Sequence, residues 1–240
     1  MWPGYQNSNN EEGDIVGFKV IKTSTPNYRK GRNGKNILAI VDHITAGSFP
    51  GCLDWMINPA AKASAHYLVT RGGEVYQLVE DKNTAWHAGG INRPTWKLCD
   101  GSNPNETTIG IEHENIGGGA LTEDQYQATL SLHWNLSQKY HIPIDRDHIL
   151  GHCEIDSVSR KWDPGAQFPW ERLFRDLRKK EERGERMCYN TINELPEWGK
   201  NTVQKLLDKK YLSGDGNALN LSQDMVRILV IMDRAGVFGK

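Results

Sequence analysis

Apolar positions change their spacing along the first three quarters of the chain. "NILAIVDH" (36–43) is a nearly continuous apolar run, which predicts a strand buried on both faces. "AHYLVT" and "EVYQLV" flank Gly72 and Gly73, a two-residue turn signal, and predict a β-hairpin. "TTIGIEHEN" and "HILGH" predict two further strands, and the polar stretch between about 82 and 106 predicts a long loop.

Helical spacing appears in two later segments. "LTEDQYQATLSLHWNLSQKY" (121–140) repeats apolar residues every three or four positions, and Thr122 with Gln125 predicts a capping box at its start. "PWERLFRDLRKK" begins with Pro169, a residue favoured in the first helical turn, and predicts a closing helix. Strands mixed with helices indicate an α/β layer domain.

A change of composition divides the chain. "KKEERGERM" offers no apolar face, so we expect it to separate two domains. We expect a large α/β domain over 1–178, a charged linker over 179–188 and a small helical module over 189–240. The module has two helical patterns on either side of the turn signal "SGDGN" (213–217). It has no second copy in the chain.

Charge and targeting signals narrow the partners. The 240 residues carry a formal net charge of −1, so we expect neither nucleic acid nor an anionic membrane as the main partner. No run of about 18 apolar residues predicts a membrane span. The start lacks the basic and apolar regions of a secretory signal, and the four cysteines lack the spacing of a disulfide framework or zinc knot.

Three polar residues stand where a catalytic metal site is commonly built. His43 ends one predicted strand, His152 ends another, and Asp163 follows eleven positions later before Pro-Gly. A catalytic zinc ion usually takes three protein ligands from His, Asp, Glu or Cys, often on loops at strand ends. Taken singly, a histidine at a strand end is usually packed or at the surface, and aspartate before Pro-Gly is usually a turn residue.

Five motifs in order carry a family resemblance. "IVDHITAG", "SAHYLVTRGGEVYQLV", "TAWHAG", "TTIGIEHEN" and "GHCEIDSVSRKWDPG" resemble the type 2 N-acetylmuramoyl-L-alanine amidases over about 37–170. That family of zinc hydrolases includes phage endolysins and bacterial autolysins, and is related to animal peptidoglycan recognition proteins. The resemblance implies a central mixed β-sheet flanked by helices, and cleavage of the amide between N-acetylmuramic acid and L-alanine in peptidoglycan.

The resemblance also implies the metal ligands. His43, His152 and Asp163 match the positions that hold one zinc ion. Some relatives use a cysteine as the third ligand, which makes Cys153 an alternative. We prefer Asp163, because Cys153 directly follows His152 and its side chain would point the other way on an extended backbone.

Two further residues receive catalytic roles from the resemblance. Alternation along "TIGIEHE" places Glu112 and Glu114 on the same face, so periodicity does not separate them, and the match to the family's "IGIE" selects Glu112 as general base. Lys161, two positions before Asp163, is implied to stabilise negative charge on the attacked carbonyl oxygen. We expect its neighbour Arg160 at the surface.

The motif "TAWHAG" supplies the expected substrate contacts. His87 resembles a position in the substrate groove, and Trp86 either stacks on a sugar or packs against the protein. We expect a structural role for His66. The remaining histidines match no motif and are expected at the surface or in the core with satisfied hydrogen bonds: His113, His133, His141 and His148.

Peptidoglycan is therefore the expected partner. The 189–240 module would bind a secondary wall polymer, or instead form a homodimer or docking surface through apolar residues such as Met225 and Ile228. The absent signal sequence fits a bacteriolytic endolysin or autolysin that is made in the cytoplasm and reaches the cell wall through a phage-type lysis system or another export route.

Three other functions remain open. The first is a non-catalytic peptidoglycan-binding protein, although all three candidate ligands are present. The second is a cysteine peptidase that uses Cys153 or Cys52, neither of which lies in a nucleophile motif. The third is an intracellular recycling amidase that acts on soluble muropeptides, against which the appended module argues.

Overall fold

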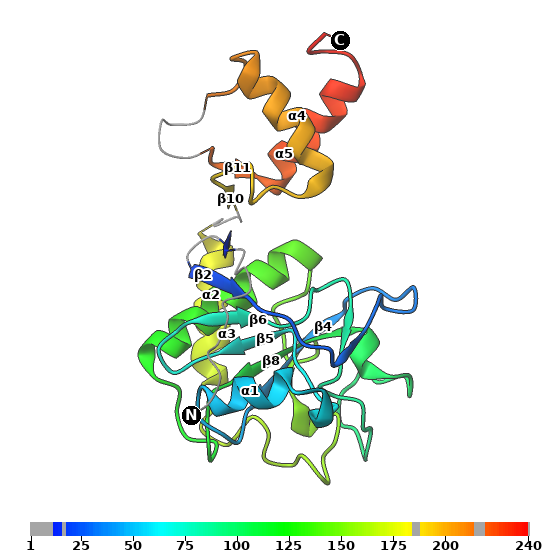
Figure 1. Cartoon of the computed structure of the whole chain (residues 1–240), viewed down its shortest axis with the longest axis vertical. Helices are drawn as coiled ribbons and strands as arrows, with labels where there is room; N and C mark the ends of the chain where they lie inside the picture. The colour runs from blue at the N-terminus through cyan, green and yellow to red at the C-terminus, as the bar shows by residue number, and fades with distance from the viewer. Residues whose placement is uncertain (1–11, 16–17, 184–187, 214–218, 240) are drawn as a thin grey trace, which may run out of the picture.

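A computed structural model describes residues 12–15, 18–183, 188–213 and 219–239. Among these residues, one sheet of seven strands, in the order β1-β2-β6-β5-β8-β4-β9, forms the centre of the larger part (Figure 1). The strand bounds are β1 Glu12–Ile15, β2 Phe18–Lys22, β4 Ala39–Ile44, β5 Tyr67–Val69, β6 Val75–Gln77, β8 Thr108–His113 and β9 Ile149–Gly151. A second, two-stranded sheet pairs β3 (Tyr28–Arg29) with β7 (Thr84–Ala85).

The middle of the main sheet is parallel. β4 pairs in parallel with β8 and β9, and β8 pairs in parallel with β5. β5 and β6 form the predicted antiparallel hairpin. The predicted mixed sheet is confirmed, but the edge pair β1–β2 was not predicted. Since β4, β8 and β9 run in the same direction, the residues that end them meet at one edge of the sheet.

Alternating side chains of the strands enter separate apolar clusters. Tyr67 and Val69 pack with α2 (Glu123–Tyr140) and α3 (Trp170–Glu182), whereas Leu68 packs with α1 (Gly51–Ile57). The two faces of the sheet are therefore covered by different helices, as the resemblance implied. Short 3₁₀ helices lie at Pro59–Ala61, Pro104–Glu106 and His152–Glu154.

The start of α2 is fixed partly as the sequence predicted. Thr122 is the N-cap, and its hydroxyl accepts a hydrogen bond from the Gln125 N–H at 3.2 Å. The reciprocal half of the predicted capping box was wrong. The Gln125 side chain donates instead to the carbonyls of Val69 and Glu114, both at 3.1 Å, because these buried strand-end acceptors lie against the helix.

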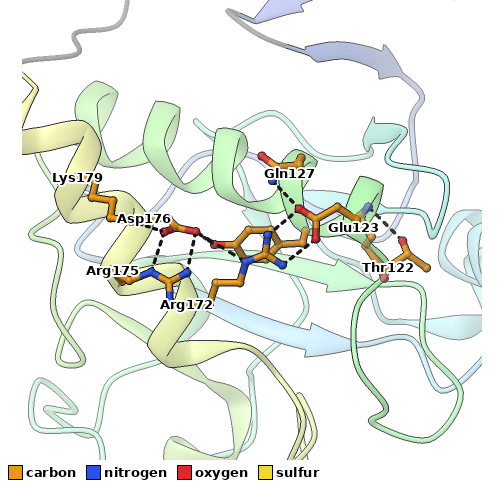
Figure 2. Close-up of polar contacts among 9 residues, drawn as sticks. Thr122, Glu123, Gln127, Arg172, Arg175, Asp176 and Lys179 are labelled. Atoms are coloured by element: carbon orange, nitrogen blue, oxygen red, sulfur yellow. Dashed lines mark hydrogen bonds and ion pairs between the residues drawn. The ribbon is translucent and has the colours of Figure 1, made fainter.

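Polar contacts join α3 to α2 (Figure 2). The Arg172 guanidinium donates two hydrogen bonds to the Glu123 carboxylate at 2.8 and 2.6 Å, and lies 3.6 Å from the centre of the Tyr126 ring. The Tyr126 hydroxyl donates to Asp176 at 2.7 Å. These contacts attach α3 to α2, and both helices pack against the sheet face that contains Tyr67 and Val69.

The C-terminal part has its own apolar cluster (orange and red in Figure 1). β10 (Cys188–Tyr189) pairs with β11 (Leu221–Ser222), beside α4 (Glu197–Asp208) and α5 (Gln223–Arg234). The two predicted helices are present, and the short strand pair was not predicted.

Some predictions fall outside the described residues. These are most of the "SGDGN" turn, the N-terminal segment 1–11, and 184–187 of the expected linker. The beginning of that linker, 179–182, is helical and belongs to α3. The proposed domain boundaries remain a prediction. None of the helices in the described part of the chain is long and apolar enough to cross a membrane.

Candidate active site and metal centre

The shared edge of β4, β8 and β9 brings the candidate residues together. His43 lies beside Glu112 in the parallel register, and His152 directly follows β9. A cavity of about 500 Å³ opens at this edge. Its lining includes His43, His87, Glu112, His152, Arg160, Asp163, Cys52 and Trp55.

His43, His152 and Asp163 form a compact group of ligand atoms. The Oδ2 atom of Asp163 lies 3.2 Å from Nδ1 of His43 and 3.2 Å from Nδ1 of His152, and the three side chains are only 15%, 2% and 7% exposed. The ligand atoms all lie within 4.8 Å of one another. Two imidazole nitrogens and a carboxylate oxygen in this arrangement fit a catalytic zinc ion.

Cys153 is not part of this group. It contributes its backbone N–H, which donates to the Asp163 carbonyl at 2.9 Å. Of the two candidates for a third ligand that the sequence offered, Asp163 is therefore the one whose side chain lies beside both histidines.

The protonation states of the group suit a cation. Burial would raise the pKa of Asp163, but hydrogen bonds with His152 and His43 outweigh burial and hold that pKa well below its usual range. Burial lowers the pKa of His152. Burial also acts to lower the pKa of His43, but the contact with Asp163 raises it overall. A charged carboxylate beside histidines that can lose a proton is what a bound metal requires.

The loop that carries Asp163 rests directly on the loop after β8. A Cβ atom on Gly165 would lie 2.5 Å from the Cα of Gly118, and both glycines have positive φ angles, +104° and +73°. The Asn115 Oδ1 atom accepts hydrogen bonds from the N–H groups of Gly117, Gly118 and Gly119. Backbone packing therefore sets the distance between the end of β8 and the third ligand.

The structure distinguishes the two glutamates that periodicity left equivalent. Glu114 accepts hydrogen bonds from the backbone N–H groups of Phe49 at 2.9 Å and Arg71 at 2.7 Å, which gives it a structural role. Glu112 lines the cavity, and its buried Oε2 atom has no hydrogen-bond partner among the described residues. Desolvation raises the pKa of Glu112 to about 7, which suits a proton acceptor at neutral pH.

The turn before Asp163 presents a different cation from the one expected. Arg160 is exposed, as expected, and it also lines the cavity, which was not predicted. Lys161 is exposed, its Nζ lies 5.6 Å from the centre of the Trp162 ring, and it is absent from the cavity lining. Asp156 accepts hydrogen bonds from the N–H groups of residues 158 and 159, which form the turn before these two cations. The role expected for Lys161 remains a prediction.

The "TAWHAG" residues occupy two different environments. His87 lines the cavity and its Nδ1 lies 3.0 Å from Nε2 of His43; burial, with smaller contributions from neighbouring histidines, lowers the pKa of His87 well below its ordinary value. Trp86 is 36% exposed and does not line the cavity. Trp55, on α1, lines the cavity and is 58% exposed, but no motif signalled it in the sequence.

Asp42 and two histidines without motifs lie buried on the opposite face of β4. Nε2 of His133 lies 3.1 Å from Asp42 Oδ2, and its Nδ1 donates to the Thr129 carbonyl at 2.8 Å. Burial would lower the pKa of His133, but the Asp42 carboxylate raises it. His113 donates from Nδ1 to the backbone carbonyl of His43 at 3.0 Å, and thus supports the ligand-bearing strand.

Comparisons with known proteins identify the family of the chain. Residues 33–166 match the family model described as N-acetylmuramoyl-L-alanine amidase. The chain is 33% identical over 186 residues to the 1,6-anhydro-N-acetylmuramyl-L-alanine amidase AmpD of Haemophilus influenzae, which covers 70% of this chain and 96% of that protein. It is 36% identical over 191 residues to AmpD of Escherichia coli, with coverage of 71% and 97%.

A solved structure supports the fold. The Escherichia coli amidase AmiD, in complex with the substrate anhydro-N-acetylmuramic acid-L-Ala-D-gamma-Glu-L-Lys, aligns with a TM-score of 0.50 at 24% identity. The alignment covers 92% of this chain and 86% of AmiD. From the family match and the relatives, the chain belongs to the N-acetylmuramoyl-L-alanine amidase family of hydrolases, which cleave an amide bond of peptidoglycan.

Proposed function

We propose that this chain is a zinc-dependent N-acetylmuramoyl-L-alanine amidase in which His43, His152 and Asp163 hold one zinc ion. The observation that carries the proposal is the single compact group of these three side chains at a cavity that also contains Glu112. When bound, zinc would lower the pKa of a coordinated water and polarise the substrate carbonyl.

Glu112 would move the proton. Its carboxylate, whose Oε2 has no hydrogen-bond partner among the described residues, accepts a proton from the attacking water and delivers it to the nitrogen of L-alanine as the carbon–nitrogen bond breaks. The oxygen of the water becomes part of the lactyl carboxylate on the sugar, and its proton ends on the free amine of the peptide. The raised pKa of Glu112 makes it both a competent acceptor and a competent donor near neutral pH.

A cation on the turn before Asp163 would stabilise the negative charge on the attacked carbonyl oxygen. The family motif assigns this role to Lys161. The cavity lining offers Arg160 as a second candidate. Trp86 remains the proposed sugar contact from the motif, and the exposed ring of Trp55 in the cavity lining is a second candidate.

We propose cell-wall peptidoglycan as the substrate, cleaved by a bacteriolytic enzyme of the endolysin or autolysin kind. In this proposal the protein acts on the cell wall, which it reaches through a phage-type lysis system or another export route. A soluble anhydromuropeptide is the second candidate, because the curated relatives are named 1,6-anhydro-N-acetylmuramyl-L-alanine amidases.

The C-terminal part would serve the same substrate or the assembly of the enzyme. Its separate apolar cluster supports a module that forms its own core. Binding of a secondary wall polymer would raise the local concentration of the catalytic part at the wall. Exposed apolar residues on α5, Met225, Ile228 and Ile231, support a homodimer as the alternative.

A paired digest tests the proposal. Purified Gram-positive peptidoglycan and a soluble anhydromuropeptide are incubated with the protein, with and without a chelator, and new amino-terminal alanine and new reducing sugar ends are measured. We expect alanine termini without reducing ends, lost with chelator and restored by zinc. The substrate that is cleaved faster identifies the biological setting.

Controls separate the other functions. If the protein bound the wall but released neither alanine termini nor reducing ends, it would be a non-catalytic peptidoglycan-binding protein. Cys153→Ser and Cys52→Ser should each retain activity, and loss of activity in either with the fold intact would favour a cysteine nucleophile instead.

A further inference from the structure

His87 lies directly behind the proposed metal ligand His43. Its Nδ1 is 3.0 Å from Nε2 of His43, the ring nitrogen that faces away from Asp163. The other nitrogen, Nε2 of His87, is 3.1 Å from the hydroxyl oxygen of Thr108. The two rings meet edge to face, with centroids 5.1 Å apart.

The end of this chain of hydrogen bonds fixes the direction of every member. The Thr108 hydroxyl donates its single proton to the Pro104 carbonyl at 2.8 Å, because a carbonyl only accepts. Thr108 therefore accepts from Nε2–H of His87, which leaves Nδ1 of His87 as an acceptor. That acceptor takes the Nε2–H of His43, so Nδ1, which faces Asp163, is the nitrogen that a neutral His43 leaves free for a metal.

The position of the His87 ring is set by its surroundings. A Cβ atom on Gly110 would lie 2.4 Å from Cγ of His87, so the ring occupies the space above this glycine of β8. The Asn105 Oδ1 atom accepts hydrogen bonds from the backbone N–H groups of His87 at 3.1 Å and Ala88 at 2.7 Å. The ring therefore cannot move toward β8, and its backbone is anchored.

We infer that His87 is a positioning residue that fixes the tautomer and ring orientation of His43, so that Nδ1 is offered to the metal. The inference rests on the proposed zinc site and differs from the substrate contact that the sequence motif suggested. Histidine ligands of metals almost always donate their other N–H to a fixed acceptor, and such acceptors contribute to metal affinity. Here the acceptor is a second histidine, itself fixed through Thr108 to the backbone.

A matched pair of variants tests this role. Asn and Leu have nearly the same shape, but the Asn side-chain oxygen can accept the His43 N–H and Leu cannot. Zinc affinity is measured by competition with a chromophoric chelator. We expect His87→Leu to weaken zinc binding about 10- to 100-fold, the usual effect of losing such a partner, and His87→Asn to recover most of that loss.

A second variant acts at the far end of the chain of hydrogen bonds. Thr108→Val keeps the volume of the side chain and removes the acceptor for Nε2 of His87, so we expect weaker zinc binding in the same direction. Thermal melting of each metal-free variant checks that the fold persists. For zinc-loaded protein, we expect His87→Leu to leave KM nearly unchanged, whereas a substrate contact would raise KM without changing zinc affinity.

Each remaining outcome decides against the inference. Unchanged zinc affinity in His87→Leu would overturn it, and so would equal losses in the Leu and Asn variants, which would indicate packing alone. A parent protein that binds no zinc would overturn the proposed metal site itself, before any variant is compared. Zinc binding by the parent together with normal binding by His87→Leu would leave the proposed function standing and remove only the role of His87.

Discussion

The backbone N–H of Ile44 donates a hydrogen bond to Oδ1 of Asp163 at 2.8 Å, across a sequence separation of 119 residues. The strand that presents His43 therefore also orients the carboxylate that lies beside it. One oxygen of Asp163 is held by the backbone, and the other is directed to the two histidines.

Asp163→Asn tests whether the two oxygens of Asp163 have these separate roles. The amide oxygen can still accept from Ile44, which would direct the NH₂ group toward the histidine nitrogens and against a cation. We expect the fold to persist while zinc affinity and amidase activity fall at least about 100-fold, because a charged ligand is lost. Chelator competition and the alanine-release assay measure both, and retained activity would contradict Asp163 as a ligand.

Glu112→Gln should remove activity and stabilise the metal-free protein. Its folded pKa of about 7 lies above the ordinary value of 4.5, so ionisation disfavours the folded state increasingly as pH rises from 4.5 to 7. The variant should therefore gain on the order of 1–3 kcal/mol at pH 8 and almost nothing at pH 4. Urea unfolding at both pH values measures the gain, and activity should fall about 10²- to 10⁴-fold.

Glu114→Gln, directly after the end of β8, is the matched control. Because Glu114 accepts two backbone N–H groups, the substitution should lower stability at pH 8 rather than raise it. If both variants changed stability in the same direction, the different environments assigned to the two carboxylates would be wrong.

His133→Gln should cost more stability in acid than in base. The Asp42 carboxylate raises the pKa of His133 above its ordinary value of 6.5, so the protonated histidine stabilises the fold below about pH 6.5. That contribution is lost as pH rises through the folded pKa. Urea unfolding of parent and variant at pH 5.5 and 9 measures the difference, and an equal cost at both pH values would argue against a charged His133.

Arg160 and Lys161 give competing expectations for the same turn. Because Arg160 lines the cavity and Lys161 does not, we expect Arg160→Met to lower kcat more than Lys161→Met, with zinc affinity unchanged in both. Steady-state kinetics on a soluble muropeptide would measure the two losses. The opposite order would support the family assignment to Lys161 and indicate that the turn rearranges when substrate binds.

The regular elements were predictable because they bury a repeated pattern. The run that contains His43 and the helix after Thr122 have strong periodicity, and both are present with nearly the expected bounds. β1, at the edge of the sheet, and its neighbour β2 were missed; the sequence EGDI of β1 contains a single large apolar residue, which shows no period.

The environment of the site residues depends on contacts from distant segments. Alternation could not separate Glu112 from Glu114, because the difference comes from the amides of Phe49 and Arg71. Motifs supplied His43, His152 and Asp163 as candidates, and the parallel register of the strands explains why two of them meet. Arg160 lines the cavity on a turn that Asp156 caps, and no motif records that turn.

The contact between Gly118 and Gly165 also limits how this enzyme can evolve. Each residue is already the smallest available, so a larger side chain at one position cannot be compensated by a smaller one at the other. A mutational library should therefore recover glycine at both positions, while the sequence on either side of the crossing remains free to vary. The crossing acts as a fixed point of the catalytic loops, around which new substrate preferences can be selected without displacing Asp163.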